Sequence, residues 1–232
     1  MWYKVKKIYV GDKLIYPMWK VNDNTLLYMP LESDALDRSW KGRTTSPSNI
    51  SYWTLWWVNT AYNSSWNWYI AVSPTDIVVW STEWTVSMLV YYTGNISEYR
   101  LAMNFNRYGS YWLWIWIYSS KWTIWTNSNS QSFAVPSPLS TNNWYHVLYT
   151  VDNNGAIAYI NWNQVASWTK TTGSVRWDWS SDSNWNQYIF ANRTPDNYWK
   201  WWIREVIIES RKWDAAEVEA YNRYIRQKLW IS

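Results

Sequence analysis

Few residues of this chain could do acid–base or nucleophilic chemistry. The sequence has one histidine, His146, and no cysteine, so it offers neither a histidine cluster nor a thiolate zinc site. His146 could serve as a general base. It alternates with Tyr145 and Val147 in an apolar run typical of a strand, which favours a structural histidine.

Glu205 and Glu209 come nearest to a glycosidase pair. Some β-sandwich glycosidases carry a Glu-x-Asp-x-x-Glu strand, which places carboxylates on one face as acid and nucleophile. Here Val206 and Ile208 occupy the positions between, and no third acid completes the set. We therefore predict no catalysis, and we interpret Glu205 as a partner that stabilises a nearby turn.

The elements that would position these residues are mostly short strands. Short β-branched and aromatic runs recur between turn clusters: TLLYMPL, WYIAVS, WTVSMLVYY, YRLAMNF, LWIWIY, WYHVLYTV, AIAYIN, QYIFA and IREVIIE. This pattern favours a sandwich or barrel. Asp214 followed three residues later by Glu217 is a helix-start signature, and Val218, Tyr221, Ile225 and Leu229 share one helical face. A C-terminal helix is expected over about 214–229, packed on the strands.

The N-terminal segment is expected to form a separate element. Residues 5–16 alternate around Gly11-Asp12 as in a hairpin, and residues 17–24 look like a linker. This divides the chain into 1–24 and 25–232. Because an isolated hairpin is only marginally stable, residues 1–21 are predicted to pair with another chain, docking the module onto a larger particle or oligomer, or to add to the sandwich edge.

Composition limits the class of partner. The 21 basic and 17 acidic residues leave a formal charge of +4 spread along the chain, unlike the dense basic stripe of a nucleic-acid binder. We expect no nucleic-acid partner. The start lacks the apolar core of a signal peptide, and no run of about 18 apolar residues suggests a membrane span.

Tryptophan is unusually frequent in this chain and glycine is unusually rare. The chain has 26 Trp and 6 Gly, whereas glycine is usually about 7% of residues. Many tryptophans occupy turn positions typical of glycine, including Trp40, Trp66, Trp122, Trp162 and Trp185. We hypothesise that most are UGA codons read as glycine in the source organism. Trp84, Trp144 and Trp213 are expected to be true tryptophans, and the alternative is a genuinely Trp-rich chain whose indoles bind sugars or a membrane surface.

Three stretches resemble laminin G-like domains of the concanavalin A-like lectin/glucanase superfamily. They are LLYMPLESDALDRSWKGR at 26–43, WTVSMLVYYTG at 84–94 with WYHVLYTVDNNGAIAYINWNQVAS at 144–167, and YWKWWIREVIIESRKWDAAEVEAY at 198–221. The resemblance implies an all-β, two-sheet antiparallel jelly-roll sandwich. Arg204 stands where the family usually has Asp, which puts in doubt any ligand role inherited from that position.

The resemblance implies a glycan-binding or adhesion module on a virion or cell surface. VKKIYVGDKLIYP is similar to N-terminal segments of phage tail proteins, although far less specifically. The alternatives are a purely structural capsid or tail decoration domain and, third, a glycoside hydrolase. Polar or aromatic residues that could line a sugar site are Arg100, Asn104, Arg107, Tyr108, Asn192 and Arg193. Many relatives hold calcium, for which the loop candidates are Asp34, Asp37, Asp178, Asp182 and Asp196. The interpretation favoured for each of these residues is nevertheless a solvated turn residue.

Overall fold

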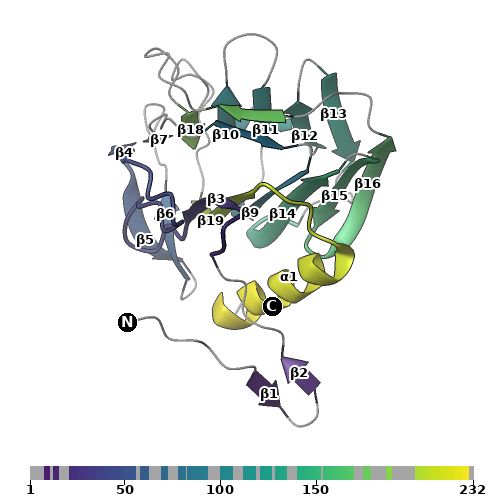
Figure 1. The fold of residues 1–232 in the computed structure, drawn as a ribbon. Helices are drawn as coiled ribbons and strands as arrows, with labels where there is room; N and C mark the ends of the chain where they lie inside the picture. Colours follow the sequence, from purple (N-terminus) through teal and green to yellow (C-terminus); the bar gives the residue numbers. More distant parts are fainter. Residues whose placement is uncertain are drawn as a thin grey trace.

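The chain folds as an antiparallel β-sandwich with one C-terminal helix, as the sequence predicts (Figure 1). This computed structural model describes residues 8–10, 13–15, 21–55, 58–62, 69–72, 78–81, 83–93, 100–106, 112–118, 121–126, 129–134, 140–152, 154–169, 175–178, 187–189 and 202–229. Among them α1 is the one helix, and it lacks the length and apolar character needed to cross a membrane.

One layer is a seven-stranded sheet, in the order β13-β12-β11-β10-β18-β7-β4. Its strands are β4 (Thr45–Ser48), β7 (Tyr69–Val72), β10 (Arg100–Asn106), β11 (Trp112–Tyr118), β12 (Lys121–Thr126), β13 (Asn129–Ala134) and β18 (Gln187–Ile189). Pro47 lies in β4 at the sheet edge, where a residue without an N–H is tolerated.

The other layer is an eight-stranded sheet, in the order β16-β15-β14-β9-β19-β6-β5, with β3 also paired to β19. Its strands are β3 (Thr25–Met29), β5 (Ser51–Leu55), β6 (Val58–Tyr62), β9 (Trp84–Tyr92), β14 (Asn143–Val151), β15 (Gly155–Ile160), β16 (Asn163–Thr169) and β19 (Trp202–Glu209). Separate two-stranded sheets pair β8 (Val78–Ser81) with β17 (Val175–Asp178), and β1 (Ile8–Val10) with β2 (Lys13–Ile15). The β1–β2 pair confirms the predicted hairpin around Gly11-Asp12.

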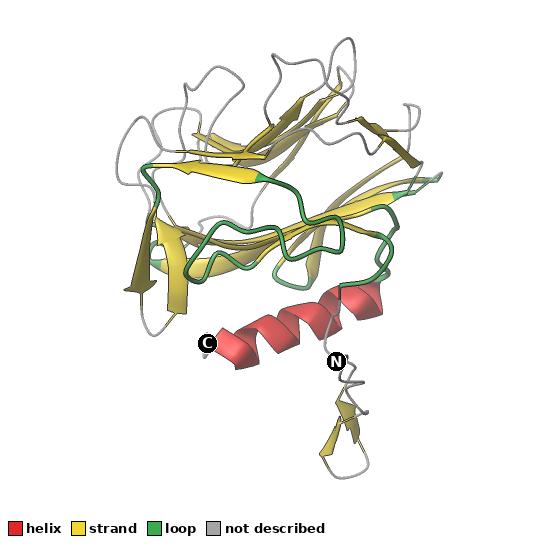
Figure 2. Cartoon of the chain, turned by 60° about the vertical axis from the view of Figure 1, so that its left-hand side comes forward, coloured by secondary structure: helices red, strands yellow, loops and turns green. Residues whose placement is uncertain are grey.

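The core lies in two layers because side chains of the central strands alternate between faces. Val86, Met88 and Val90 of β9 join the cluster between the sheets, which Ile70 and Ile189 enter from the opposite layer. Leu89 and Tyr91 of β9 instead belong to a second cluster, under α1 (Ala215–Leu229). Figure 2 shows this helix lying along the outer side of one strand layer.

The start of α1 follows the sequence signature. The Glu217 backbone N–H donates to Asp214 Oδ1 at 2.8 Å, and the Asp214 N–H donates to Glu217 Oε2 at 3.0 Å. This reciprocal capping box satisfies amides that have no partner within the helix. Val218, Tyr221 and Ile225 are buried against the sheet, whereas the side chain of Leu229 lies outside the described residues.

Candidate functional site

The predicted sugar-binding residues that the structure describes belong to strand β10. Arg100 begins this strand opposite Ile117 of β11, and Asn104 lies between Trp114 of β11 and Tyr188 of β18. A register shift between Leu101 and Met103 separates the two residues along the strand. Arg107, Tyr108, Asn192 and Arg193 lie outside the described residues. The structure therefore describes two of the six predicted residues, and both belong to an interior strand of the seven-stranded sheet.

His146 forms a serine–histidine pair that sequence reasoning missed. Its Nε2 lies 2.7 Å from Ser87 Oγ on the adjacent strand β9. Both residues are about 1% exposed, and the Tyr221 ring of α1 packs edge-on to the imidazole with centroids 5.4 Å apart. Burial lowers the pKa of His146 to about 3, while the neighbouring Asn222 acts in the opposite direction. A neutral imidazole sealed under a helix has no access to a substrate, which supports its structural interpretation.

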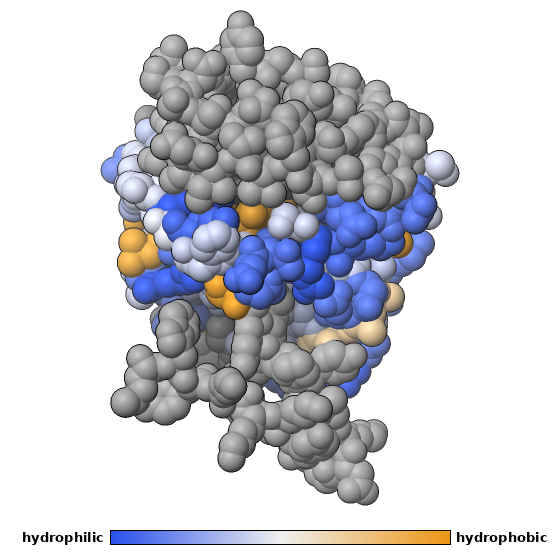
Figure 3. Space-filling model, in the orientation of Figure 1, coloured by the Kyte–Doolittle hydropathy of each residue, from blue (hydrophilic) through white to orange (hydrophobic). Residues whose placement is uncertain are grey.

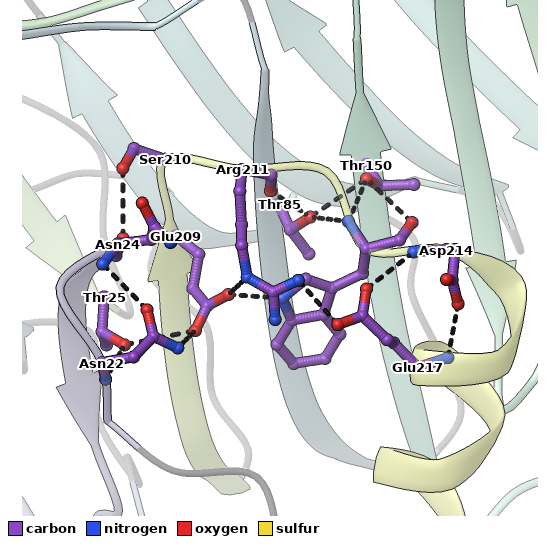
Figure 4. Close-up of polar contacts among 11 residues, drawn as sticks. Asn22, Asn24, Thr25, Thr85, Thr150, Glu209, Ser210, Arg211, Asp214 and Glu217 are labelled. Carbon is purple, nitrogen blue, oxygen red and sulfur yellow. Dashed lines mark hydrogen bonds and ion pairs between the residues drawn. The ribbon is translucent and has the colours of Figure 1, made fainter.

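Glu209 is the centre of a buried polar network (Figure 4). Its side chain is fully buried. Oε2 accepts the Trp213 indole N–H at 2.6 Å and lies 2.8 Å from Arg211 Nε. Oε1 accepts Asn22 Nδ2 at 3.1 Å and Thr25 Oγ1 at 3.2 Å. The carboxylate therefore joins the segment before β3 to the segment between β19 and α1.

The same segment is tied to the sheet by two threonines (Figure 4). The Trp213 backbone N–H donates to Thr85 Oγ1 at 3.0 Å and to Thr150 Oγ1 at 3.1 Å, and Thr85 Oγ1 donates to Arg211 O at 2.8 Å. Arg211 also bonds Glu217 of the capping box, at 2.6 Å. Since each of these groups has its partners inside the protein, the network positions α1.

Glu205 bonds the helix α1, a partner that its position in the sequence did not indicate. Its carboxylate Oε2 accepts the Tyr221 hydroxyl at 2.6 Å. The residue has φ 50° at a register shift between β19 and β9, and its N–H donates to Pro30 O at 3.2 Å. Neighbouring Arg204 is buried and bonds Glu32 and the Asn59 carbonyl. Both candidate glycosidase carboxylates thus lie inside the sheet–helix interface, with 1% and 0% exposure.

The predicted calcium carboxylates serve other contacts where they are described. Asp37 is buried, and its oxygens accept the backbone N–H groups of Tyr28, Ser39 and Arg43 at 2.9–3.1 Å. Asp34 caps Leu36 N and pairs with Arg38 at 2.6 Å. Asp178 lies in strand β17 rather than in the predicted loop, and Asp182 and Asp196 are outside the described residues. Within the described ranges no three His, Asp or Glu residues gather to hold a metal.

The tryptophans divide by burial. Trp84, Trp144 and Trp213, expected to be true tryptophans, are 1–7% exposed. Trp40 and Trp162, at predicted glycine turns, are 56% and 45% exposed. Contrary to the turn argument, positive φ in these two turns falls on Gly42 and Asn161. The backbone of each turn therefore obtains its left-handed residue from a neighbour of the tryptophan.

The exposed indoles of Trp40 and Trp162 are accompanied by cations. Lys41 Nζ lies 3.2 Å from the Trp40 ring centroid, and the Arg226 guanidinium lies 5.4 Å from that of Trp162. Such cation–π contacts occupy a ring face that a sugar would otherwise use. The described surface in Figure 3 is mainly hydrophilic, with small separate apolar areas.

The sequence and the fold both match known proteins. A family model for the concanavalin A-like lectin/glucanases superfamily matches residues 63–219, more than half of the chain. No curated protein matches the sequence.

Solved structures with this fold include several binding domains. The ligand-binding domain of botulinum neurotoxin serotype D, in complex with N-acetylneuraminic acid, has a TM-score of 0.71 and 18% identity, covering 88% of this chain and 52% of that one. Domain 4 of a GH43 extracellular arabinanase from Geobacillus stearothermophilus, in complex with arabinotriose, has a TM-score of 0.67 and 17% identity, and the match covers 86% of this chain and 98% of that domain. The binding domain of Paraclostridial Mosquitocidal Protein 1 has a TM-score of 0.70 and 15% identity, and the match covers 89% of this chain and 53% of that one. The chain spans about half the length of the two toxin domains.

Proposed function

Because the chain belongs to the concanavalin A-like lectin/glucanases superfamily, we propose that it is a non-catalytic glycan-binding or adhesion module. The observation that carries this proposal is the burial of Glu205 and Glu209. Both are buried and bonded to the segment and helix that cover the sheet. Glycoside hydrolysis requires two carboxyl groups that reach the scissile bond, and this pair does not.

Structural neighbours and the residues of β10 support a glycan as the ligand. Two neighbours of the same fold were solved with sugars bound, one with N-acetylneuraminic acid and one with arabinotriose. Arginine and asparagine side chains carry donors and acceptors that suit hydroxyl or carboxylate groups of a sugar, and Arg100 and Asn104 both belong to β10. We propose that they bind the glycan together with Arg107, Tyr108, Asn192 and Arg193.

A glycan array followed by calorimetry tests the proposal, with arabinotriose and N-acetylneuraminic acid as first ligands. Arg100→Ala and Asn104→Ala should each weaken binding about tenfold, the loss of one or two polar contacts. Arg223→Ala, which removes an exposed cation on α1, is the matched control and should bind normally. Absence of binding to every glycan would instead support a structural decoration domain.

Hydrolysis provides a second arm. No reducing ends should be released from polysaccharides. Release that disappears in a folded Glu205→Gln or Glu209→Gln protein would establish a glucanase and refute the binding-only proposal.

We propose that the module lies on a virion or a cell surface. The similarity of residues 5–17 to phage tail segments favours the virion. Flanking genes for tail or capsid assembly would support the virion, whereas flanking genes for cell-envelope export would refute the virion and favour a cellular adhesin.

We further propose that most of the tryptophans are glycines encoded by UGA codons. The burial of Trp84, Trp144 and Trp213 and the exposure of Trp40 and Trp162 support this idea, whereas the positive φ at Gly42 and Asn161, in place of the tryptophans, does not. Trp202 fits less well, because its ring packs edge-on to Tyr91 with centroids 5.3 Å apart. The gene should carry UGA at positions such as 40, 66, 116, 162 and 202, and UGG at 84 and 144. UGG at all of these positions would refute recoding.

A further inference from the structure

The hairpin β1–β2 has no strand partner within the sandwich. Its register pairs Ile8 with Ile15, Tyr9 with Leu14 and Val10 with Lys13. Among the strands that the structure describes, β1 and β2 pair only with each other, and Figure 1 shows them beyond α1, away from both sheets. Each strand therefore has one edge whose N–H and C=O groups receive no strand partner.

The composition of the hairpin is that of a buried strand pair. Five of its six strand residues are apolar, the exception being Lys13. Successive cross-strand pairs belong to opposite faces of the pleat, so the Ile8–Ile15 and Tyr9–Leu14 pairs give each face apolar positions. A peptide lying on a membrane surface needs one polar face. Apolar positions on both faces instead favour enclosure by protein.

The segment also carries the net charge of the protein. Residues 1–20 contain one acid, Asp12, and five lysines, at positions 4, 6, 7, 13 and 20. Their net charge of +4 equals that of the whole chain, so residues 21–232 hold equal numbers of basic and acidic residues. The expected even spread of the +4 charge is therefore wrong: basic residues occur along the whole chain, but their excess over acidic residues lies in this segment. Two such segments repel each other, which disfavours self-pairing.

We propose that residues 1–20 are a docking element that binds an acidic strand edge on a partner protein by β-strand addition. The open edges of β1 and β2 supply main-chain hydrogen bonds, the apolar pairs supply burial, and the lysines select an acidic partner. This role is independent of glycan binding, since it uses none of the β10 residues.

A model strand tests the proposal on the full chain. The probe is the acetylated and amidated peptide Glu-Val-Glu-Val-Glu-Val-Glu, with the Gln-for-Glu peptide as the neutral match. Binding is followed by fluorescence anisotropy, and hydrogen exchange reports on the β1 and β2 amides. The acidic peptide should bind at least tenfold more tightly than the neutral one, more weakly at high salt, and should protect those amides.

Two variants separate charge from backbone pairing. Lys-to-Gln changes at 4, 6, 7 and 13 together should remove the preference for the acidic peptide, and Tyr9→Pro, which removes a strand N–H, should weaken binding of both peptides. Arg223→Gln is the control cation and should change nothing. Circular dichroism confirms that the sandwich remains folded in each protein.

Several outcomes would overturn the proposal. One is equal binding of the two peptides, or unchanged binding by the Lys-to-Gln variant. Another is lysine-dependent binding to phosphatidylcholine–phosphatidylglycerol vesicles without binding to the peptide, which would assign the segment to a lipid surface. A dimer in sedimentation that the Tyr9→Pro variant loses would assign it to a second copy of the chain.

Discussion

Replacing Glu209 by glutamine tests whether this carboxylate holds the structure together or serves chemistry. The substitution keeps the shape of the side chain and removes its charge. Oε2 accepts from Trp213 and Arg211, and Oε1 accepts from Asn22 and Thr25. Whichever of the two oxygens is replaced by an NH₂ group, the two donors that it accepted from then face another donor and lose their hydrogen bonds.

The cost follows from the burial of the site. A hydrogen bond to a charged group contributes about 1.5–3 kcal/mol, and removing one partner of a buried ion pair costs about 3–5 kcal/mol. The Thr25 hydroxyl can rotate to accept from the amide, and the Arg211 side chain is 28% exposed, so water recovers part of the loss. We therefore expect Glu209→Gln to lower the free energy of unfolding by about 3 kcal/mol, or about 6–12 °C in Tm for a chain of this size.

Urea denaturation followed by circular dichroism measures this loss. Glu219→Gln is the matched control, because Glu219 pairs with Arg223 at 2.5 Å on the exposed side of α1, and such pairs contribute under about 1 kcal/mol. A Glu209→Gln protein as stable as the wild type would refute the structural reasoning. The same protein, if stable but impaired in a hydrolytic activity of the wild type, would return Glu209 to the list of catalytic candidates.

Three other perturbations have definite outcomes. Burial holds the pKa of His146 at about 3, so on acidification the unfolded state takes up a proton before the folded state does. Wild-type stability should therefore fall by about 2 kcal/mol between pH 6.5 and pH 5. His146→Gln should abolish that pH dependence, and an equal pH dependence in both proteins would refute the role given to His146. The Lys212 hydrogen bond, opposed in part by desolvation, lowers the pKa of Asp152 to about 2, so the stabilisation from this carboxylate is present above its unfolded pKa and is lost as the pH falls through 2. Allowing for solvent screening, Asp152→Asn should cost about 1 kcal/mol at pH 7 and only a small part of that at pH 2, as urea titrations would measure. Deleting residues 1–21 should shift Tm by no more than about 2 °C, because the Asn22 contact to Glu209 survives; a chain that unfolds would show that the segment is integral to the sandwich.

Periodicity predicted the central elements of the fold. The runs TLLYM, WTVSMLVYY and WYHVLYTV coincide with β3, β9 and β14, and the Asp214–Glu217 signature located the helix to within a residue. These elements bury large apolar side chains, so composition and spacing define them locally. Strand β4, with sequence TSPS, carries no such signal because its burial pattern is largely exposed.

Polar positions were harder to assign because their partners are distant in sequence. Asp37 reads as a solvated turn residue until Tyr28, nine residues earlier, donates to it. Glu209 meets Asn22 across 187 residues, and no local pattern indicates that contact. Ser87 is a small polar residue in an apolar strand, and only the pairing of β9 with β14 brings it to His146. The sugar-site prediction stays a prediction.

The position of β19 has a consequence for how the chain folds. This late strand lies between β9 on one side and β3 and β6 on the other, so it joins segments separated by about half of the sequence or more. Closing such large loops is entropically costly, and chains dominated by distant contacts fold slowly. During synthesis the first strands must wait, with apolar edges open, until residues 202–209 leave the ribosome. Chaperones that cover the nascent chain through this interval should therefore raise the yield of folded protein.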